Sequence, residues 1–240
     1  MKIYHYTSIE TLALILHNKT IRFSRLDYVD DPDEFNFKKY GYDPSKYVYV
    51  SCWTKSSLEN IPQWIMYGNK KQGVRISVDS DLFQIVGNRW LDNEEIYSLD
   101  YMIMPKLKDD VLRDIEYVEN VDDCLSRVFQ SEDDNTRLLF PEVARYKNTI
   151  WSFQKESRFI LCVFPKEPNS EKINPVQSIS NNIYCNREYI DIPINERVLD
   201  TMEITLGPEV IPYQEIIVKS LINQYAPKCK LKKSRFSGVF

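Results

Sequence analysis

The sequence is poor in glycine and histidine, and both shortages exclude classes of function. It has six glycines in 240 residues, and no two of them are spaced G-x-G. The dinucleotide fingerprint of a Rossmann fold is therefore absent, as is the G-x-x-x-x-G-K-[ST] phosphate loop. The chain also lacks the H-E-x-x-H zinc motif, the G-x-S-x-G nucleophile elbow and the protein-kinase signatures. A nucleotide-binding function would have to use a rarer scheme.

Cysteines are few, odd in number and scattered, and no C-x-x-C pair occurs. The five are Cys52, Cys124, Cys162, Cys185 and Cys229. This pattern supports neither a zinc site nor a disulfide framework, so we expect free thiols in a reducing compartment and no bound metal. A nucleophilic cysteine would need a histidine beside it, and two histidines leave few candidates.

Long apolar runs are also missing. None approaches the roughly 18 residues of a membrane span, and the first twenty residues lack the layout of a signal peptide. We therefore expect a cytoplasmic protein with no membrane partner.

The net charge of −4 argues against a general nucleic-acid coat. The exception is a basic C-terminal tail at about 226–240, with Lys228, Lys230, Lys232, Lys233 and Arg235. A solvated terminus is the favoured interpretation of such a run, and steering of an anionic partner is the alternative.

The order of expected elements predicts a single α+β domain over 1–240, because strands and helices do not alternate as in a doubly wound sheet. Tyrosine-, valine- and isoleucine-rich runs predict strands at 2–7, 20–24, 46–54, 73–83, 115–120, 157–164, 187–194 and 202–209. Helices are predicted at 8–19 with Ser8 as N-cap, at 60–69, at 135–151 with an interruption at Pro141, and at 214–220.

An acidic loop follows the second strand, with Asp27, Asp30, Asp31, Asp33 and Glu34. Carboxylates this dense can hold Mg²⁺, which would suit a metal-dependent nuclease or phosphotransferase. A solvated loop with an Asx-turn around Pro32 is the favoured interpretation.

The opening "YHYTS…LALIL…TIRFSRLDYVDDPDEF" resembles the start of a bacterial family of unknown function, number 2971. Its members open with a Y-H-Y-T-S-type strand and carry an N-D-P-x-E loop; here that loop reads Asp30-Asp31-Pro32-Asp33-Glu34. The likeness continues through "VSCWT", "QWIMYGNKKQGVRISV", "SFQKESRFIL" and "ITLGP", in the expected order over most of the chain.

That family in turn resembles the ADP-ribosyltransferase fold, an α+β fold with a split, mainly antiparallel mixed sheet flanked by helices. The resemblance rests on a histidine in the first strand, a tyrosine in a short helix and a glutamate at the start of a later strand: His5, Tyr67 and Glu156. It implies an NAD-dependent transferase, such as a bacterial toxin or phage-defence effector, that moves ADP-ribose to a protein or nucleic acid.

The implied chemistry suits these three residue types. A carboxylate at Glu156 would stabilise the oxocarbenium-like centre formed when the nicotinamide–ribose bond breaks. The ring of Tyr67 would stack on nicotinamide, and a neutral His5 would bind ribose hydroxyls. Further NAD-binding groups would be Thr7, Ser51 and Arg158, with Arg158 orienting Glu156 or a phosphate.

Structural interpretations compete at each position. His5 could be a half-buried residue bonded to a backbone carbonyl, and Tyr67 could join Trp64 in the core. Glu156 could pair with Arg158 or Lys155 on the surface, although a carboxylate opening an apolar strand has little structural reason to be there. Gln154 and Glu156 have the Q-x-E spacing of the acceptor-side motif of other transferases. In those transferases the first strand carries an arginine, whereas here it carries His5. A non-catalytic module that binds nucleotide or protein remains a third function.

Overall fold

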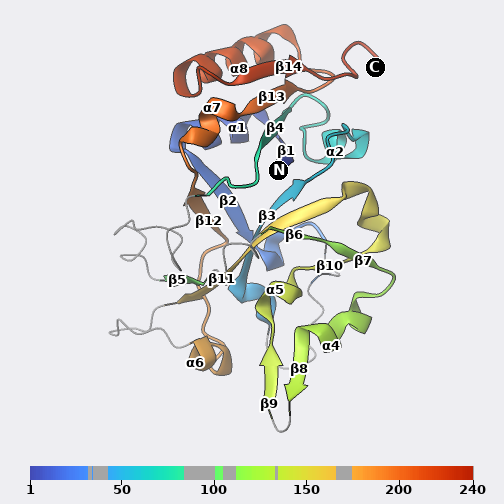
Figure 1. The fold of residues 1–240 in the computed structure, drawn as a ribbon, viewed down its shortest axis with the longest axis vertical. Coiled ribbons are helices and arrows are strands. Elements are labelled where there is room, and N and C mark those ends of the chain that lie inside the picture. The colour runs from blue at the N-terminus through green and yellow to red at the C-terminus, as the bar shows by residue number, and fades with distance from the viewer. Residues whose placement is uncertain are drawn as a thin grey trace.

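The computed structural model describes residues 1–31, 34, 43–83, 101–104, 112–132, 135–165 and 175–239. These residues form an α+β structure, as predicted, with one mainly antiparallel sheet of ten strands and helices packed around it (Figure 1). Two further pairs of short strands lie outside this sheet.

The main sheet contains β1 (Lys2–Thr7), β2 (Thr20–Arg25), β3 (Val48–Thr54), β4 (Val74–Asp79), β5 (Tyr101–Met104), β6 (Leu112–Asp114), β11 (Glu156–Pro165), β12 (Tyr189–Pro193), β13 (Glu203–Leu206) and β14 (Lys230–Lys233). The small pairs are β7 (Glu116–Val118) with β10 (Tyr146–Asn148), and β8 (Phe129–Glu132) with β9 (Asn135–Leu138).

The helices are α1 (Ile9–Asn18), α2 (Ile61–Met66), α4 (Leu125–Val128), α5 (Phe140–Val143), α6 (Pro175–Ser180), α7 (Arg197–Thr201) and α8 (Pro212–Tyr225). The 3₁₀ segments are η1 (Leu26–Tyr28), η3 (Pro44–Tyr47), η4 (Val121–Cys124) and η5 (Thr149–Gln154). Within the described segments, no helix has the length and apolar character needed to cross a membrane.

Strand β3 is the centre of the sheet. One of its edges pairs with β11 along its whole length, from Thr54 opposite Glu156 to Val48 opposite Cys162. The other edge is shared: β2 pairs at Tyr49 and Val50, and β1 pairs at Thr54. Residues 51–53 of β3 therefore have no partner strand on this edge among the described strands. The sheet opens here, between β1 and β2.

The two largest of the three apolar clusters formed by the described residues lie on the sheet. The larger packs α1 and α8 against strands β1, β4 and β13, with Leu12, Val218 and Ile76 fully buried. The smaller packs α4 and α5 against β3 and β11, with Val128 fully buried and Ile160 6% exposed. Helix α1 begins where the sequence indicates, because the Ser8 side chain accepts a hydrogen bond from the Thr11 N–H at 3.1 Å.

The helix predicted over 135–151 is wrong. This segment contains β9, the four-residue α5, β10 and η5. Pro141 lies in the first turn of α5, where its missing N–H costs little, so the helix begins at the proline instead of being interrupted by it. Residues 146–148 then pair in parallel with 116–118, a tertiary contact that overrides the local helical pattern.

The basic tail is also more ordered than a solvated terminus. Its residues 230–233 form β14, which pairs in parallel with β13 and extends the main sheet. Three of its lysines contact carboxylates: Lys228 with Asp200 at 2.7 Å, Lys232 with Glu203 at 2.5 Å and Lys233 with Glu215 at 3.6 Å. Figure 1 shows β14 beside α8 at one end of the molecule, far from the β8–β9 pair at the other.

Candidate functional site

A cavity of about 330 Å³ lies at the opening between β1 and β2. Three of its lining residues, His5 of β1, Tyr67 after α2 and Glu156 of β11, are the three that the sequence singled out. Ser51 and Arg158 line it as well. Thr7 does not: it is 7% exposed and pairs with Val74 in the ladder between β1 and β4. Five of the six predicted site residues are thus brought together.

The residues that line the cavity include Cys52 and Trp53, neighbours in β3 whose side chains point to opposite faces of the sheet. On one face the His5 ring lies 5.1 Å from the Trp53 ring, centroid to centroid. On the other face the Cys52 thiol helps to lower the pKa of the Glu156 carboxyl. Side chains from both faces can meet one ligand only because the sheet is open at residues 51–53.

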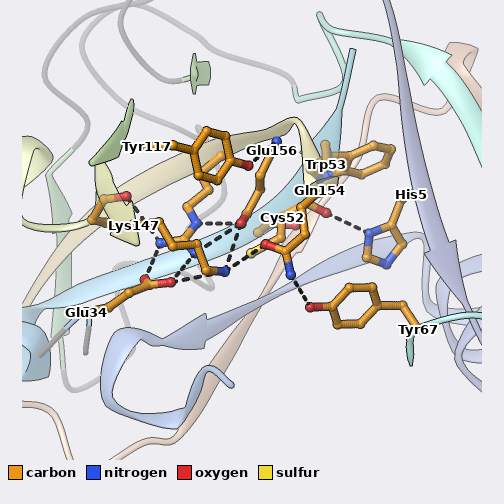
Figure 2. A network of polar contacts seen from close by, with 12 residues as sticks. His5, Glu34, Cys52, Trp53, Tyr67, Tyr117, Lys147, Gln154 and Glu156 are labelled. Atoms are coloured by element: carbon orange, nitrogen blue, oxygen red, sulfur yellow. Dashed lines mark hydrogen bonds and ion pairs between the residues drawn. The ribbon is translucent and has the colours of Figure 1, made fainter. Parts of the chain in front are cut away.

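His5 is held by a backbone carbonyl. Its Nδ1 lies 2.8 Å from the Cys52 oxygen, which can only accept, so Nδ1 carries the proton (Figure 2). Burial lowers the pKa of His5 and outweighs the opposite effect of this hydrogen bond, which keeps the ring neutral at pH 7. Nε2 then presents a lone pair, for which the described residues supply no donor. A hydrogen bond to a backbone carbonyl is what a structural histidine would make. Here the same hydrogen bond also fixes the tautomer of His5.

Tyr67 lines the cavity and is only partly buried, whereas its neighbour Trp64 is fully buried. The Tyr67 hydroxyl accepts a hydrogen bond of 2.6 Å from Nε2 of Gln154. Figure 2 shows the Gln154 side chain between Tyr67 and Lys147. The other end of the same amide accepts from Nζ of Lys147 at 2.9 Å. Gln154 is 3% exposed and engaged at both ends, so it does not face an acceptor in the way that the Q-x-E motif would imply.

Glu156 belongs to a buried network of four charged groups, called here the ion network: Glu34, Lys147, Glu156 and Arg158. Arg158 donates from Nε to Glu156 at 2.5 Å and through both terminal nitrogens to Glu34 at 2.5 and 2.7 Å. Nζ of Lys147 lies 3.2 Å from each of the two carboxylates. Two acids and two bases balance, so the network carries no net charge.

The ion network keeps Glu156 ionised. Burial by itself would raise the pKa of this carboxyl, but the charges of Arg158 and Lys147 outweigh it and lower the pKa from 4.5 to about 2. In return, the two carboxylates raise the pKa of Lys147 despite its burial. Glu156 therefore cannot donate a proton near neutral pH, and it offers a fixed negative charge instead.

Two expectations for this region are wrong. A structural reason for a carboxylate at the start of β11 does exist: Glu156, 7% exposed, compensates the buried guanidinium of Arg158. Its pairing with Arg158 is also in the interior and not on the surface. Arg158 in turn has all five N–H donors occupied, by Glu34, Glu156 and the Ala144 carbonyl. It can orient Glu156, but it has no N–H left for a phosphate.

The solvated-loop interpretation fails for part of the acidic segment. Asp31 and Glu34 are each 1% exposed, and Glu34 is a member of the ion network. Asp27 pairs with Arg25 at 2.6 Å. The predicted turn at Pro32 and Asp33 lies outside the described residues. Across the described segments, no three His, Cys, Asp or Glu side chains are grouped so that they could hold a metal ion.

Sequence reasoning missed Lys147 and Glu34. Lys147 lay in the segment read as a helix, and Glu34 in the loop read as solvated. One signal was available: Arg158 stands inside the apolar run of β11, and a buried guanidinium requires carboxylates nearby. Cys52 also lines the cavity, but burial raises its pKa well above the usual value, so it is a thiol and not a thiolate nucleophile.

No family model, curated protein or solved structure matches this chain. The resemblance to family 2971 and to the ADP-ribosyltransferase fold therefore stays a prediction.

Proposed function

We propose that this protein is an NAD-dependent ADP-ribosyltransferase of the family-2971 type, and that the cavity binds the nicotinamide–ribose end of NAD. The observation that carries the proposal is the convergence of His5, Tyr67 and Glu156, from three separate elements, on one cavity where the sheet opens. A split sheet with such a triad is what the resemblance implies for the fold.

The state of Glu156 suits this chemistry. In the reaction, the bond between the ribose C1 and the nicotinamide nitrogen breaks, and the electron pair leaves with nicotinamide. An acceptor nucleophile then bonds to C1 and releases its proton. The sugar passes through a positively charged centre, which a carboxylate that stays ionised can stabilise. Arg158 and Lys147 fix the position of that carboxylate.

Tyr67 and His5 have matching roles. The ring of Tyr67, held by Gln154, supplies a flat face for the nicotinamide ring. Nε2 of His5, with its tautomer fixed, can accept a hydrogen bond from a ribose hydroxyl. The acceptor would be a protein or nucleic acid, as in a toxin or phage-defence effector.

The other two functions have less support. A metal-dependent nuclease would need the acidic loop, but its Glu34 is already bound by two cations. A non-catalytic module would bind NAD without consuming it, which the following experiment distinguishes.

The test is to incubate the folded protein with NAD and a cell lysate, and to measure nicotinamide release and labelled ADP-ribose on macromolecules. We expect both from the wild type, and a loss of at least 100-fold in Glu156→Gln. Because that substitution leaves a positive charge in the ion network, the double variant Glu156→Gln/Lys147→Gln restores charge balance and should fold better while staying inactive. Glu142→Gln, which removes an arginine-paired carboxylate elsewhere, is the control and should keep activity.

The proposal would be overturned if the wild type consumed no NAD and its melting temperature did not change when NAD was added. If the protein bound NAD without consuming it, the non-catalytic module would be the supported function. Activity that requires Mg²⁺ and is lost with EDTA would favour the nuclease or phosphotransferase.

A further inference from the structure

Three cationic side chains line the cavity: Arg22, Lys147 and Arg158. Lys147 directs its ammonium group at three oxygens, on Gln154, Glu156 and Glu34, and an ammonium has three N–H donors. Arg158 likewise has all five donors occupied. The two buried cations therefore have no hydrogen-bond donor left for a ligand, although NAD carries a diphosphate with two negative charges.

Arg22 differs from both. Its Nε and Nη2 donate to the two carboxylate oxygens of Asp191 at 2.9 and 3.0 Å, and its Cζ lies 3.5 Å from the centroid of the Tyr189 ring. These contacts hold the guanidinium in one orientation. Neither of the hydrogen bonds to Asp191 uses Nη1, so Asp191 leaves the two N–H groups of this nitrogen available to a ligand. The side chain is 47% exposed, and a ligand in the cavity can reach it.

Ser24 lies two residues further along β2 and therefore on the same face as Arg22. Ser24 lines the cavity, and its hydroxyl has no hydrogen-bond partner within the described segments. The ladder between β2 and β3 ends at the pair of Ser24 with Val50, so Arg22 lies on the part of β2 that has left β3. The separation of the two strands leaves this face of β2 open to the cavity.

We propose that Arg22 and Ser24 form a subsite for the diphosphate of the bound nucleotide. The inference rests on the proposed function, which puts the nicotinamide–ribose end at Tyr67 and Glu156. A guanidinium fork and a hydroxyl are suitable donors for phosphate oxygens, and donors held in place before binding lose little entropy when a ligand arrives. Asp191 balances the charge of Arg22, so the subsite binds through directed N–H and O–H bonds more than through net charge.

The experiment measures the binding of inorganic pyrophosphate and of NAD by calorimetry. We expect Arg22→Ala to weaken both by about tenfold, the usual effect of losing a charge-assisted contact. Arg22→Lys keeps the charge but not the fork and should recover only part of the affinity. Arg127→Ala is the matched control, because Arg127 also pairs with a carboxylate and stacks near a tyrosine but does not line the cavity. It should bind both ligands as the wild type does.

The outcomes separate the subsite from the proposed function. The subsite is overturned if the wild type binds no pyrophosphate. It is also overturned if Arg22→Ala binds pyrophosphate with wild-type affinity. Both results hold even if the protein consumes NAD. Pyrophosphate binding that depends on Arg22, in a protein that never consumes NAD, leaves the subsite standing and removes the transferase. Should Arg22→Ala fail to fold, Ser24→Ala carries the same test, with an expected loss of about threefold.

Discussion

At the scale of single residues, the ion network decides what Glu156 can do. Its carboxylate is buried and matched by two cations, so it is both a structural charge and the centre of the proposed chemistry. Removing one partner of such a network leaves an uncompensated buried charge, which typically costs 3–5 kcal/mol. Activity measurements on Glu156 variants therefore require a stability measurement beside them.

The acid dependence of stability tests this charge directly. The pKa of Glu156 is lowered from 4.5 to about 2 in the folded protein, so the folded state is favoured above pH 4.5 and loses this contribution as the pH falls toward 2. The shift corresponds to about 3 kcal/mol. At pH 6 we expect the free energy of unfolding of the wild type to be larger than that of Glu156→Gln. Near pH 2.5 we expect this difference to be smaller by about 3 kcal/mol.

Urea unfolding at a series of pH values measures the difference. Glu142→Gln serves as the control for removal of a paired carboxylate outside the cavity. A gap between wild type and Glu156→Gln that stays constant between pH 6 and pH 2.5 would contradict a carboxylate held ionised by Arg158 and Lys147.

The family resemblance pointed to His5, Tyr67 and Glu156, and the structure brings all three to one cavity, while their roles in a reaction stay predictions. The sequence did not indicate the partners of these residues. Lys147 lies in the three-residue strand β10 and Glu34 is far from β11 in sequence, so only the folded chain brings Glu34 to Arg158 and to Lys147.

At the scale of elements, the connection between α2 and β4 fixes the position of Tyr67. The chain passes through three residues with positive φ, Asn69, Lys70 and Lys71, and reaches Gly73. The Gly73 N–H donates to the Gly68 carbonyl at 2.7 Å, and its own carbonyl accepts from the Gly207 N–H at 2.9 Å. A turn this crowded joins the ends of α2, β1, β4 and β13.

Gly73→Ala should be strongly destabilising. A Cβ at this position would lie 2.2 Å from the Thr7 carbonyl oxygen and 2.9 Å from that of Gly68, both backbone atoms that cannot move away singly. We expect a loss of about 3 kcal/mol, at the upper end for overpacking, measured as a lower urea midpoint. Lys70→Ala, an exposed change in the same turn, should alter stability by less than about 0.5 kcal/mol. Equal stability of the two variants would mean that the backbone around Gly73 can move apart to accept a Cβ.

Element-level prediction was good for strands and poor for short segments. Runs such as 46–54 and 157–164 combine aromatic and β-branched residues that suit a buried strand, and β3 and β11 are found there. The segment 135–151 offered leucines and alanine in a helical pattern. The pairing of β10 with β7 is tertiary information that no local window contains, whereas the pairing of β9 with β8 lies within residues 129–138 and was overlooked in the sequence. The opening of the sheet at residues 51–53 depends on two registers at once, so the sequence did not place it, and the family resemblance implied only that the sheet is split.

At the scale of the whole molecule, the C-terminal segment ties together regions that are distant in sequence. Glu59, just before α2, accepts from the Ser234 hydroxyl at 2.5 Å, from the Arg235 N–H at 2.9 Å and from the Trp64 indole at 3.0 Å. The same segment contributes β14 to the edge of the sheet. The tail therefore braces the helix that carries Tyr67, which its basic composition did not indicate.

Removal of residues 227–240 should consequently lower stability. It deletes the ladder of β14 with β13, including the hydrogen bonds of 3.1 Å from Lys230 to Met202 and 3.0 Å from Ser234 to Leu206, and it leaves Glu59 without two of its donors. We expect a loss of about 4 kcal/mol, taking about 1 kcal/mol for each of these four hydrogen bonds. In a protein of this size that corresponds to a melting temperature lower by about 8–16 °C.

A shorter truncation that removes only 237–240 is the control. Val239 in this stretch is 66% exposed, and the hydrogen bonds described for the stretch are turn contacts to Ser234 and Phe236, so the melting temperature should change by less than about 2 °C. The longer truncation also uncovers the edge of β13, and an exposed strand edge promotes association, so light scattering should rise with protein concentration. If both truncations melt like the full chain, β14 adds nothing to the sheet, and the basic segment is the solvated terminus that its lysines first suggested.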